Sequence, residues 1–304
     1  MSSYLSQEGN DRLTAMLATA FGAAAGAYLL DPTVIELMLN PDGKLWVDRL
    51  GVGRSYTGHD LSPADAERVI FIVASSIGAT CNKDAPLLSA ELPGSGSRFQ
   101  GVLPPIAHAP SFSIRKKALK VFTIDNYVTQ NILSMVHAHA IQQAVLERKN
   151  ILIVGGTGSG KTTLANAILD LIAQTGDRIV ILEDTQELQC SALDSVALRT
   201  KDGQTSMRDL LKATLRLRPD RIVVGEVRGA EALDLIKAWN TGHPGGCATI
   251  HADSAQKALT RLEHLVLESG VKLSREAILE TVNLFIFIEK TSSTRRVSHV
   301  GELA

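Results

Sequence analysis

A glycine-rich segment at residues 155–162 carries the strongest chemical signal in this sequence. It matches the phosphate-binding P-loop pattern at every required position and stands between a predicted strand and a predicted helix. Glycines let backbone N–H groups point inward, where side chains would block the approach of phosphates. Lys161 is expected to reach the β- and γ-phosphates of ATP, and the Thr162 hydroxyl to complete the shell of a Mg²⁺ ion. The residues predicted to bind nucleotide in this segment are Gly155, Gly156, Thr157, Gly158, Ser159, Gly160, Lys161, Thr162 and Thr163.

Hydrolysis also requires carboxylates near the γ-phosphate, and two predicted strands end in them. The apolar run 222–224 leads into Gly225 and Glu226, and the run 179–182 leads into Glu183. Ligands of open α/β sheets bind at the carboxyl ends of the strands, so both acids are expected at the phosphate edge. We predict that Glu226 holds Mg²⁺ through its water shell and that Glu183 orients or deprotonates the attacking water. The alternative is that either acid is a solvated turn residue.

Arginines are the candidates for stabilising the charge that spreads over the phosphoryl oxygens in the transition state. Arg216 and Arg218 precede the strand that ends in Glu226, and we predict that both are catalytic. Further candidates are Arg98, Arg115, Arg199, Arg208 and Arg228. Because one active site uses fewer arginines than these, we expect some to act on the nucleotide of a neighbouring subunit and others to be solvated surface residues.

The run 241–252 places glycines and the histidines His243 and His251 around a predicted central strand. The glycines permit close backbone contacts. His251 follows the strand at its C-terminal end, so it is a candidate for sensing the γ-phosphate through a hydrogen bond. The alternative is a histidine whose ring nitrogens are satisfied within the core. No metal-ligand spacing accompanies the histidines, so zinc is not predicted.

The length of 304 residues and a change of texture along the chain predict two domains. Residues 34–110 mix short strands with turn-forming Asn, Gly and Pro, which indicates an α+β fold. From residue 126, helices alternate with apolar strands, the pattern of a parallel sheet covered on both faces. We therefore predict an α+β N-terminal domain at residues 1–118 and a RecA-like P-loop ATPase domain with a parallel-rich central sheet at residues 119–304.

Periodicity predicts the individual elements of the second domain. Apolar residues that recur on one helical face predict helices over 128–140, 164–172 and 232–239. Apolar runs predict strands at 151–154, 178–182, 221–224, 247–250 and 284–288.

Composition is that of a folded soluble protein, with 45% hydrophobic and 21% charged residues. A net charge of -1 offers no basic surface for a phosphate backbone, so direct sequence-specific nucleic acid binding is not expected.

Cys81, Cys190 and Cys247 show neither disulfide nor metal-ligand spacing, which fits a reducing, cytoplasmic location. The uncharged stretch 13–30 lies at the lower length limit for a membrane span, but its Ala, Gly and Thr content favours a buried helix. Any membrane contact is therefore expected to be peripheral.

The order of these motifs resembles that of the traffic ATPases of type II and type IV secretion. The corresponding boxes occupy residues 155–162, 181–184, 215–220 with 224–228, and 249–252. The runs 216–221 and 238–246 are more similar to the TrbB-type conjugative transfer ATPases and their type IV secretion relatives than to pilus retraction or type II secretion motors. The run 39–47 is also similar to that branch.

The resemblance implies a homohexameric ring in which ATP lies between the two domains of one subunit and its site is completed by the neighbour. It also implies that Arg98 and Arg115 reach the nucleotide from the first domain. Inner-membrane components of a secretion or conjugation system are the implied partners, which would place the chain peripherally at that membrane. Gly229 departs from the acidic residue that the wider superfamily carries after Glu226, which affects only the roles around Arg228.

The leading hypothesis is a motor in which ATP binding and hydrolysis swing the first domain against the second and drive substrate transfer or pilus assembly. A DNA translocase is the alternative among enzymes, and the near-neutral charge argues against it. A nucleotide-gated scaffold, in which ATP only stabilises an assembly platform, is the alternative outside the enzymes.

Overall fold

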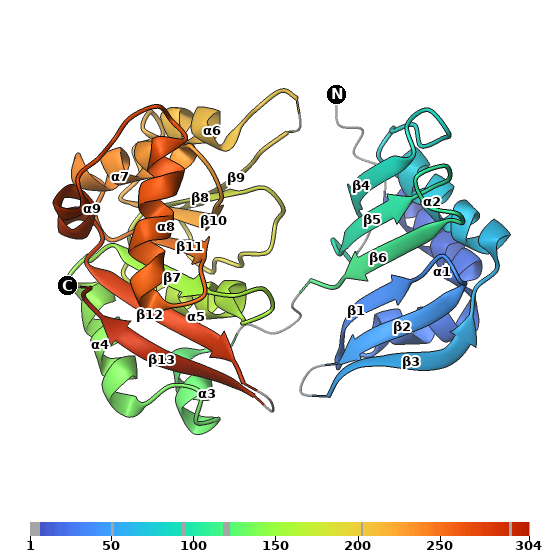
Figure 1. Ribbon diagram of the computed structural model, residues 1–304, viewed down its shortest axis with the longest axis horizontal. Helices are drawn as coiled ribbons and strands as arrows, with labels where there is room; N and C mark the ends of the chain where they lie inside the picture. The colour runs from blue at the N-terminus through green and yellow to red at the C-terminus, as the bar shows by residue number, and fades with distance from the viewer. Residues whose placement is uncertain are drawn as a thin grey trace. The chain divides into compact units, whose positions relative to one another are not determined.

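The computed structural model describes residues 7–49, 52–92, 95–117, 122–201, 203–291 and 294–303. The chain divides into two compact units, Met1–Leu119 and Lys120–Ala304, drawn in Figure 1. The domain boundary predicted between residues 118 and 119 lies outside the described residues.

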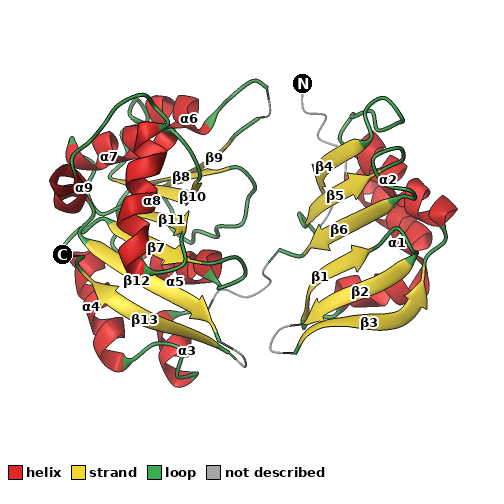
Figure 2. Cartoon of the chain, viewed as in Figure 1, coloured by secondary structure: helices red, strands yellow, loops and turns green. Residues whose placement is uncertain are grey.

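The first unit is a sheet with helices packed on it. Its six strands are hydrogen-bonded in the order β3-β2-β1-β6-β5-β4, and all neighbouring pairs are antiparallel. Its elements are α1 (Gln7–Leu30), β1 (Val34–Leu39), β2 (Lys44–Arg49), β3 (Gly53–Asp60), α2 (Pro63–Ser76), β4 (Leu87–Glu91), β5 (Arg98–Val102) and β6 (Ser111–Arg115). Helices α1 and α2 pack against each other and cover one face (Figure 2). Alternate residues of the strands, such as Phe112 and Ile114, turn inward to meet them.

Helix α1 contains the uncharged stretch 13–30. The helix is interrupted at Gly22, which has φ 71°. Leu17, Phe21 and Ala25 are buried against the first sheet's core, as the interpretation as a buried helix requires. Among the residues described, we find no helix that combines the length and apolar character needed to span a bilayer.

The second unit is built on a larger sheet whose seven strands run in the order β13-β12-β7-β11-β10-β8-β9. Only the pairing of β13 with β12 is antiparallel. Its elements are α3 (Ile124–Thr129), α4 (Met135–Leu146), β7 (Ile151–Gly155), α5 (Lys161–Ala173), β8 (Ile179–Glu183), β9 (Ser195–Arg199), α6 (Met207–Thr214), β10 (Arg221–Val227), α7 (Glu231–Asn240), β11 (Cys247–His251), α8 (Ala255–Leu267), α9 (Arg275–Thr281), β12 (Leu284–Lys290) and β13 (Arg295–Gly301). Helices α3 to α5 build the core on one face and α6 to α9 on the other. The predicted fold class, a parallel-rich α/β domain after a smaller α+β domain, is confirmed.

Burial explains why the central strands form where they do. Every residue of β7 and β8 is buried, because helices cover both faces of a parallel sheet. The predicted apolar runs therefore coincide with β7, β8, β10, β11 and β12 to within a few residues. Strand β9 was not predicted, because its residues alternate between exposed and half-buried at the sheet edge. Strand β13 was not predicted either.

The single helix predicted over 128–140 is wrong. Helix α3 ends at Thr129, and α4 begins after Ser134, whose side chain accepts a hydrogen bond from the backbone N–H of His137. Between them Asn131 has φ 57°, a left-handed conformation that a continuous helix excludes. The apolar spacing does not mark one buried face either, since Val136 is 78% exposed, and the two helices bury other residues in a shared core.

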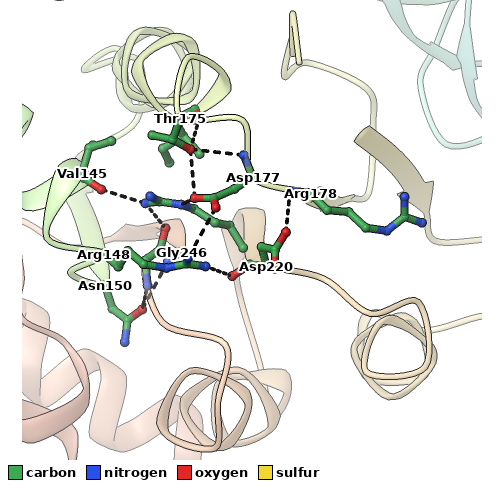
Figure 3. A network of polar contacts seen from close by, with 11 residues as sticks. Val145, Arg148, Asn150, Thr175, Asp177, Arg178, Asp220 and Gly246 are labelled. Atoms are coloured by element: carbon green, nitrogen blue, oxygen red, sulfur yellow. Dashed lines mark hydrogen bonds and ion pairs between the residues drawn. The ribbon is translucent and has the colours of Figure 1, made fainter. Parts of the chain in front are cut away.

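A buried ion pair joins the strands at their N-terminal edge (Figure 3). Arg221, the first residue of β10, is 2% exposed, and its Nε donates to Oδ2 of Asp177 at 2.6 Å. Its Nη1 also donates to the carbonyl oxygens of Val145 and Gly245 at 3.0 and 3.2 Å. Asn150 completes this edge by accepting the backbone N–H of Gly245 at 2.8 Å. The pair thus fixes α4, β8, β10 and β11 against one another.

Replacing Asp177 with asparagine is expected to lower the free energy of unfolding by about 3 kcal/mol at neutral pH, because Arg221 would remain buried without its counterion. Burial acts to raise the pKa of Asp177, but hydrogen bonds from Arg221 and Thr175 outweigh it and lower the pKa below 3.8. This contribution is therefore complete above the ordinary carboxyl pKa and is lost as pH falls through the lower folded value.

Urea unfolding followed by circular dichroism, from about pH 7 to about pH 3, tests this linkage. The difference in the free energy of unfolding between wild type and Asp177→Asn should become smaller at the acid end of this pH range. Asp194→Asn is the control, because Asp194 pairs with Arg178 while its side chain is 57% exposed, and exposed pairs contribute less than about 1 kcal/mol. An equal loss of unfolding free energy in both variants would contradict the stabilising role assigned to the Asp177–Arg221 pair.

Candidate active site

The phosphate-loop segment lies at the C-terminal end of β7 and leads into α5. Gly155 must be glycine, because a Cβ there would stand 2.3 Å from the carbonyl oxygen of Ile288. Gly160 has φ 98° and begins α5 without any side-chain cap. The loop therefore passes from a fully buried strand into an uncapped helix N-terminus, where backbone N–H groups and the helix dipole favour an anion.

Polar groups of the loop are arranged as a cradle for such an anion. The Nζ of Lys161 lies over the loop, donating to the carbonyl oxygens of Gly155 and Gly156 at 2.9 and 3.1 Å. The hydroxyl of Ser159 is buried and has no hydrogen-bond partner among the residues described. Thr162 and Thr163 occupy the first turn of α5, half-buried. An orphaned buried hydroxyl within a phosphate-loop sequence fits a ligand with acceptor oxygens.

Glu183 ends β8 as a buried residue and is not the solvated turn residue of the alternative interpretation. It is 4% exposed, and its Oε1 accepts the backbone N–H groups of Glu187 and Leu188 at 2.9 and 2.8 Å. The neighbouring strand leaves room for it, since a Cβ on Gly225 would stand 3.0 Å from the Cγ of Glu183. The structure thus brings Glu183 and the Gly225-Glu226 segment together at one sheet edge, held in a fixed orientation.

Glu226 follows an irregularity in the pairing of β10 with β11, between Val224 and Val227. Its Oε2 accepts a hydrogen bond from Nε of Arg228 at 2.8 Å, and Arg228 also approaches Asp184 at 3.3 Å. Burial acts to lower the pKa of Arg228, but the hydrogen bond and charge of Glu226 raise it overall, so the side chain is a cation. Arg228 therefore offsets part of the negative charge of the two carboxylates of Glu226 and Asp184.

His251 ends the central strand β11 and contacts the phosphate loop directly. Its Nε2 shares a hydrogen bond with Oγ1 of Thr157, the two atoms lying 2.9 Å apart. Two residues earlier on the same strand, Thr249 donates to the carbonyl oxygen of Gly225 at 2.7 Å. Strand β11 consequently links the loop on one side to the Glu226 strand on the other, and the interpretation of His251 as a core-satisfied residue does not hold because its side chain is exposed.

Of the predicted arginines in the second unit, Arg228 lies at this edge, and Arg199 lies there directly opposite Glu183 in the pairing of β8 with β9. Arg216 and Arg218, the two predicted to be catalytic, do not. Arg216 and Arg218 are exposed and precede β10, and the seven residues of that strand separate them from its C-terminal end by about 20 Å. Within one chain they are therefore not brought to the phosphate loop, and their predicted role remains open only toward a neighbouring subunit. Arg98 and Arg115 lie in the first unit, directly opposite each other on β5 and β6.

Sequence reasoning missed two residues near the loop. Thr249 carries no signal of its own within the run 241–252, and no motif marks Arg295. Arg295 begins β13, and its Cδ stands 3.1 Å from the position that a Cβ on Gly160 would occupy. Its separation from the loop in sequence explains the omission, because only the pairing of β12 with β7 brings the hairpin there.

Comparison with known proteins places this site in a family. A family model described as type II/IV secretion system protein matches residues 88–295. The chain belongs to that family. Within it, the chain is similar to the conjugal transfer protein TrbB of Rhizobium radiobacter, with 50% identity over 291 residues that cover 95% of this chain and 90% of that protein. The predicted resemblance to the TrbB-type branch of the type II/IV secretion ATPases is confirmed.

Solved structures agree with this family membership. The VirB11 ATPase from the Brucella suis type IV secretion system, determined in complex with sulphate, is 26% identical and covers 97% of both chains, with a TM-score of 0.50. The pilus retraction motor PilT, determined with bound ADP, is 19% identical, with a TM-score of 0.66. The superposition covers 95% of this chain and 83% of the PilT chain. The second likeness concerns the fold alone.

Proposed function

We propose that this family member is an ATP-hydrolysing motor subunit of a conjugative transfer or type IV secretion system. The observation that carries the proposal is the convergence of four strand ends at one sheet edge: the phosphate loop after β7, Glu183 after β8, Glu226 in β10 and His251 at the end of β11. A sheet edge of this composition combines an anion cradle with the carboxylates that hydrolysis needs.

Each group has a role that follows from its position. The loop amides and Lys161 bind the phosphate chain of ATP. Glu183, fixed by two backbone N–H groups, orients the attacking water and accepts its proton. The oxygens of Thr162 and Glu226 suit Mg²⁺, which prefers oxygen donors and keeps several waters. When bound, Mg²⁺ neutralises the charge that develops on the phosphoryl oxygens.

His251 couples the state of the nucleotide to the sheet. In this structure its Nε2 shares a hydrogen bond with Oγ1 of Thr157 in the loop. A γ-phosphate in the cradle supplies a stronger, charged partner for the same region. Since Thr249 of the same strand holds the carbonyl oxygen of Gly225, a shift of β11 is transmitted to the strand that carries Glu226.

The working assembly is proposed to be a homohexameric ring at the cytoplasmic face of the inner membrane, with secretion or conjugation components as its membrane partners. In this ring Arg98 and Arg115 would serve the nucleotide from the first domain, taken as residues 1–118. Arg216 and Arg218, remote from the loop of their own chain, would serve a neighbour's site. Similarity to the TrbB and VirB11 proteins supports this assembly.

Light scattering combined with phosphate release, measured on purified protein over a range of concentrations, tests the proposal. Specific activity should rise with concentration as particles of six subunits form, and anionic vesicles should change the rate if membrane contact matters. ATP binding without release of phosphate in any assembly state would refute the motor and leave the gated scaffold. Stimulation by duplex DNA at physiological salt would instead favour a translocase.

A further inference from the structure

The hairpin formed by β12 and β13 makes one wall of the phosphate loop. Ile288 of β12 approaches Gly155 so closely that no Cβ fits between them. Arg295, at the start of β13, lies over the last glycine of the loop, with its Cδ and Nε at 3.1 and 3.2 Å from where a Cβ on Gly160 would stand. The arginine side chain therefore occupies the space that the missing side chain of Gly160 leaves free, beside the N-terminus of α5.

Within the part of the chain that the structure describes, Arg295 has no counterion. Its Nε is buried and has no hydrogen-bond partner among the residues described, and the structure gives the side chain no ion pair there. The adjacent Arg296 behaves differently, since its Nη2 donates to Oε1 of Glu289 at 3.0 Å. The side chain is half-buried, and a guanidinium N–H that loses water without gaining a partner is unfavourable, so the unpaired Nε beside an anion cradle indicates that a ligand supplies the missing acceptor.

The surroundings of Arg295 contain aromatic and backbone groups. Burial raises the pKa of Tyr127 in α3, and the positive charge of Arg295 opposes this effect, which places the guanidinium near the phenol ring. The backbone N–H of Val297 donates to the carbonyl oxygen of Ile132 at 2.8 Å, which ties β13 to the turn between α3 and α4. The arginine is thus held on a strand whose position is set by packed helices.

We propose that Arg295 is a nucleotide-binding residue whose guanidinium pairs with the phosphate chain of a nucleotide seated in the loop. The inference rests on the proposed function, because it requires a nucleotide at residues 155–162. A guanidinium presents planar, charged donors that match phosphate oxygens. The hairpin would then close the cradle from the side opposite the carboxylates of Glu183 and Glu226, and its arginine acts within its own subunit.

Isothermal titration with ADP, which avoids hydrolysis, tests the pairing. Arg295→Gln should bind ADP about 10- to 100-fold more weakly than wild type, as expected for one charge-assisted contact. Arg296→Gln is the matched control, since it removes the neighbouring arginine on the same hairpin and should leave ADP affinity unchanged. GDP should lose affinity by the same factor as ADP, because the phosphate chain is common to both.

Thermal unfolding separates a binding role from a structural one. Without nucleotide, Arg295→Gln should melt at or above the wild-type temperature, because a buried Nε that has no hydrogen-bond partner is removed. With saturating ADP, the variant should show a smaller upward shift than wild type. A lowered melting temperature in the nucleotide-free state together with unchanged ADP affinity would overturn the proposal and make Arg295 a packing residue.

Three further outcomes would each contradict the pairing of Arg295 with the phosphate chain. Unchanged ADP affinity in Arg295→Gln, with wild type binding normally, overturns this inference and leaves the proposed function intact. A loss for ADP but not for GDP overturns the phosphate pairing in favour of a contact with the base. Absence of ADP binding by folded wild type overturns both the inference and the proposed function.

Discussion

Replacing Lys161 with alanine is expected to reduce ATP hydrolysis by roughly a thousandfold or more, the largest effect predicted for this protein. Its Nζ lies over the loop on the carbonyl oxygens of Gly155 and Gly156, from which it can turn to the phosphates without moving the backbone. Preorganised cations at the transferring phosphoryl group stabilise the transition state, and losing one such group costs about 10²–10³ in rate. Weaker binding of the nucleotide adds to this loss.

Phosphate release by the assembled protein, at several ATP concentrations, measures the effect of Lys161→Ala. Lys149→Ala is the control, because Lys149 precedes β7 at the far edge of the sheet and pairs with Glu147 on the surface. Normal turnover in Lys161→Ala would remove the assignment of residues 155–162 as the catalytic cradle. Reduced turnover in both variants, with altered circular dichroism, would point to a folding defect instead.

Changing Glu183 to glutamine is expected to keep ATP bound while slowing hydrolysis by about 10²–10⁴-fold, the usual share of a positioned general base. The amide keeps the size of the carboxylate, and its oxygen can still accept the N–H groups of Glu187 and Leu188. The loop that follows β8 should therefore keep its structure. What disappears is the negative charge that orients the water and receives its proton.

A single-turnover measurement with radiolabelled ATP separates binding from hydrolysis in Glu183→Gln. Glu147→Gln is a suitable control, since Glu147 has a side chain that is 53% exposed and pairs with Lys149 away from the site. Equal inertness of wild type and Glu183→Gln, with ATP bound to both, would show that the chain does not act as a motor. Undiminished hydrolysis in Glu183→Gln would transfer the role of base to another group.

The contrast between Glu226 and the arginines near it in sequence shows what strand geometry changes. Arg216, Arg218 and Glu226 lie within one short stretch of the sequence, and a catalytic role was predicted for each of them. Strand β10 runs between them, so the arginines precede the N-terminal end of the strand and the acid lies near its C-terminal end. Arg228, on the same side as Glu226, is the arginine that pairs with it.

The helix over 128–140 illustrates a different limit. Its apolar periodicity is present in the sequence, but Val136 is 78% exposed, and two separate helices bury other residues in the same core. The break depends on the conformation of Asn131 and on the cap at Ser134, whose hydrogen bond competes with continuation of the helix. Four apolar residues at helical spacing therefore predicted neither the buried face nor the continuity of the backbone here.

From the sequence by itself follow the phosphate loop, the central strands and the acids at their ends, because each depends on neighbouring residues and on burial patterns of short period. The tertiary structure decided the contact of Thr157 with His251, the fit of Gly225 against Glu183 and the place of Arg295 beside Gly160. These contacts join residues that are distant in the chain, and their formation depends on strand order and register. Pairing across the sheet is a property of the whole fold, and strand order and register cannot be predicted from local residue types.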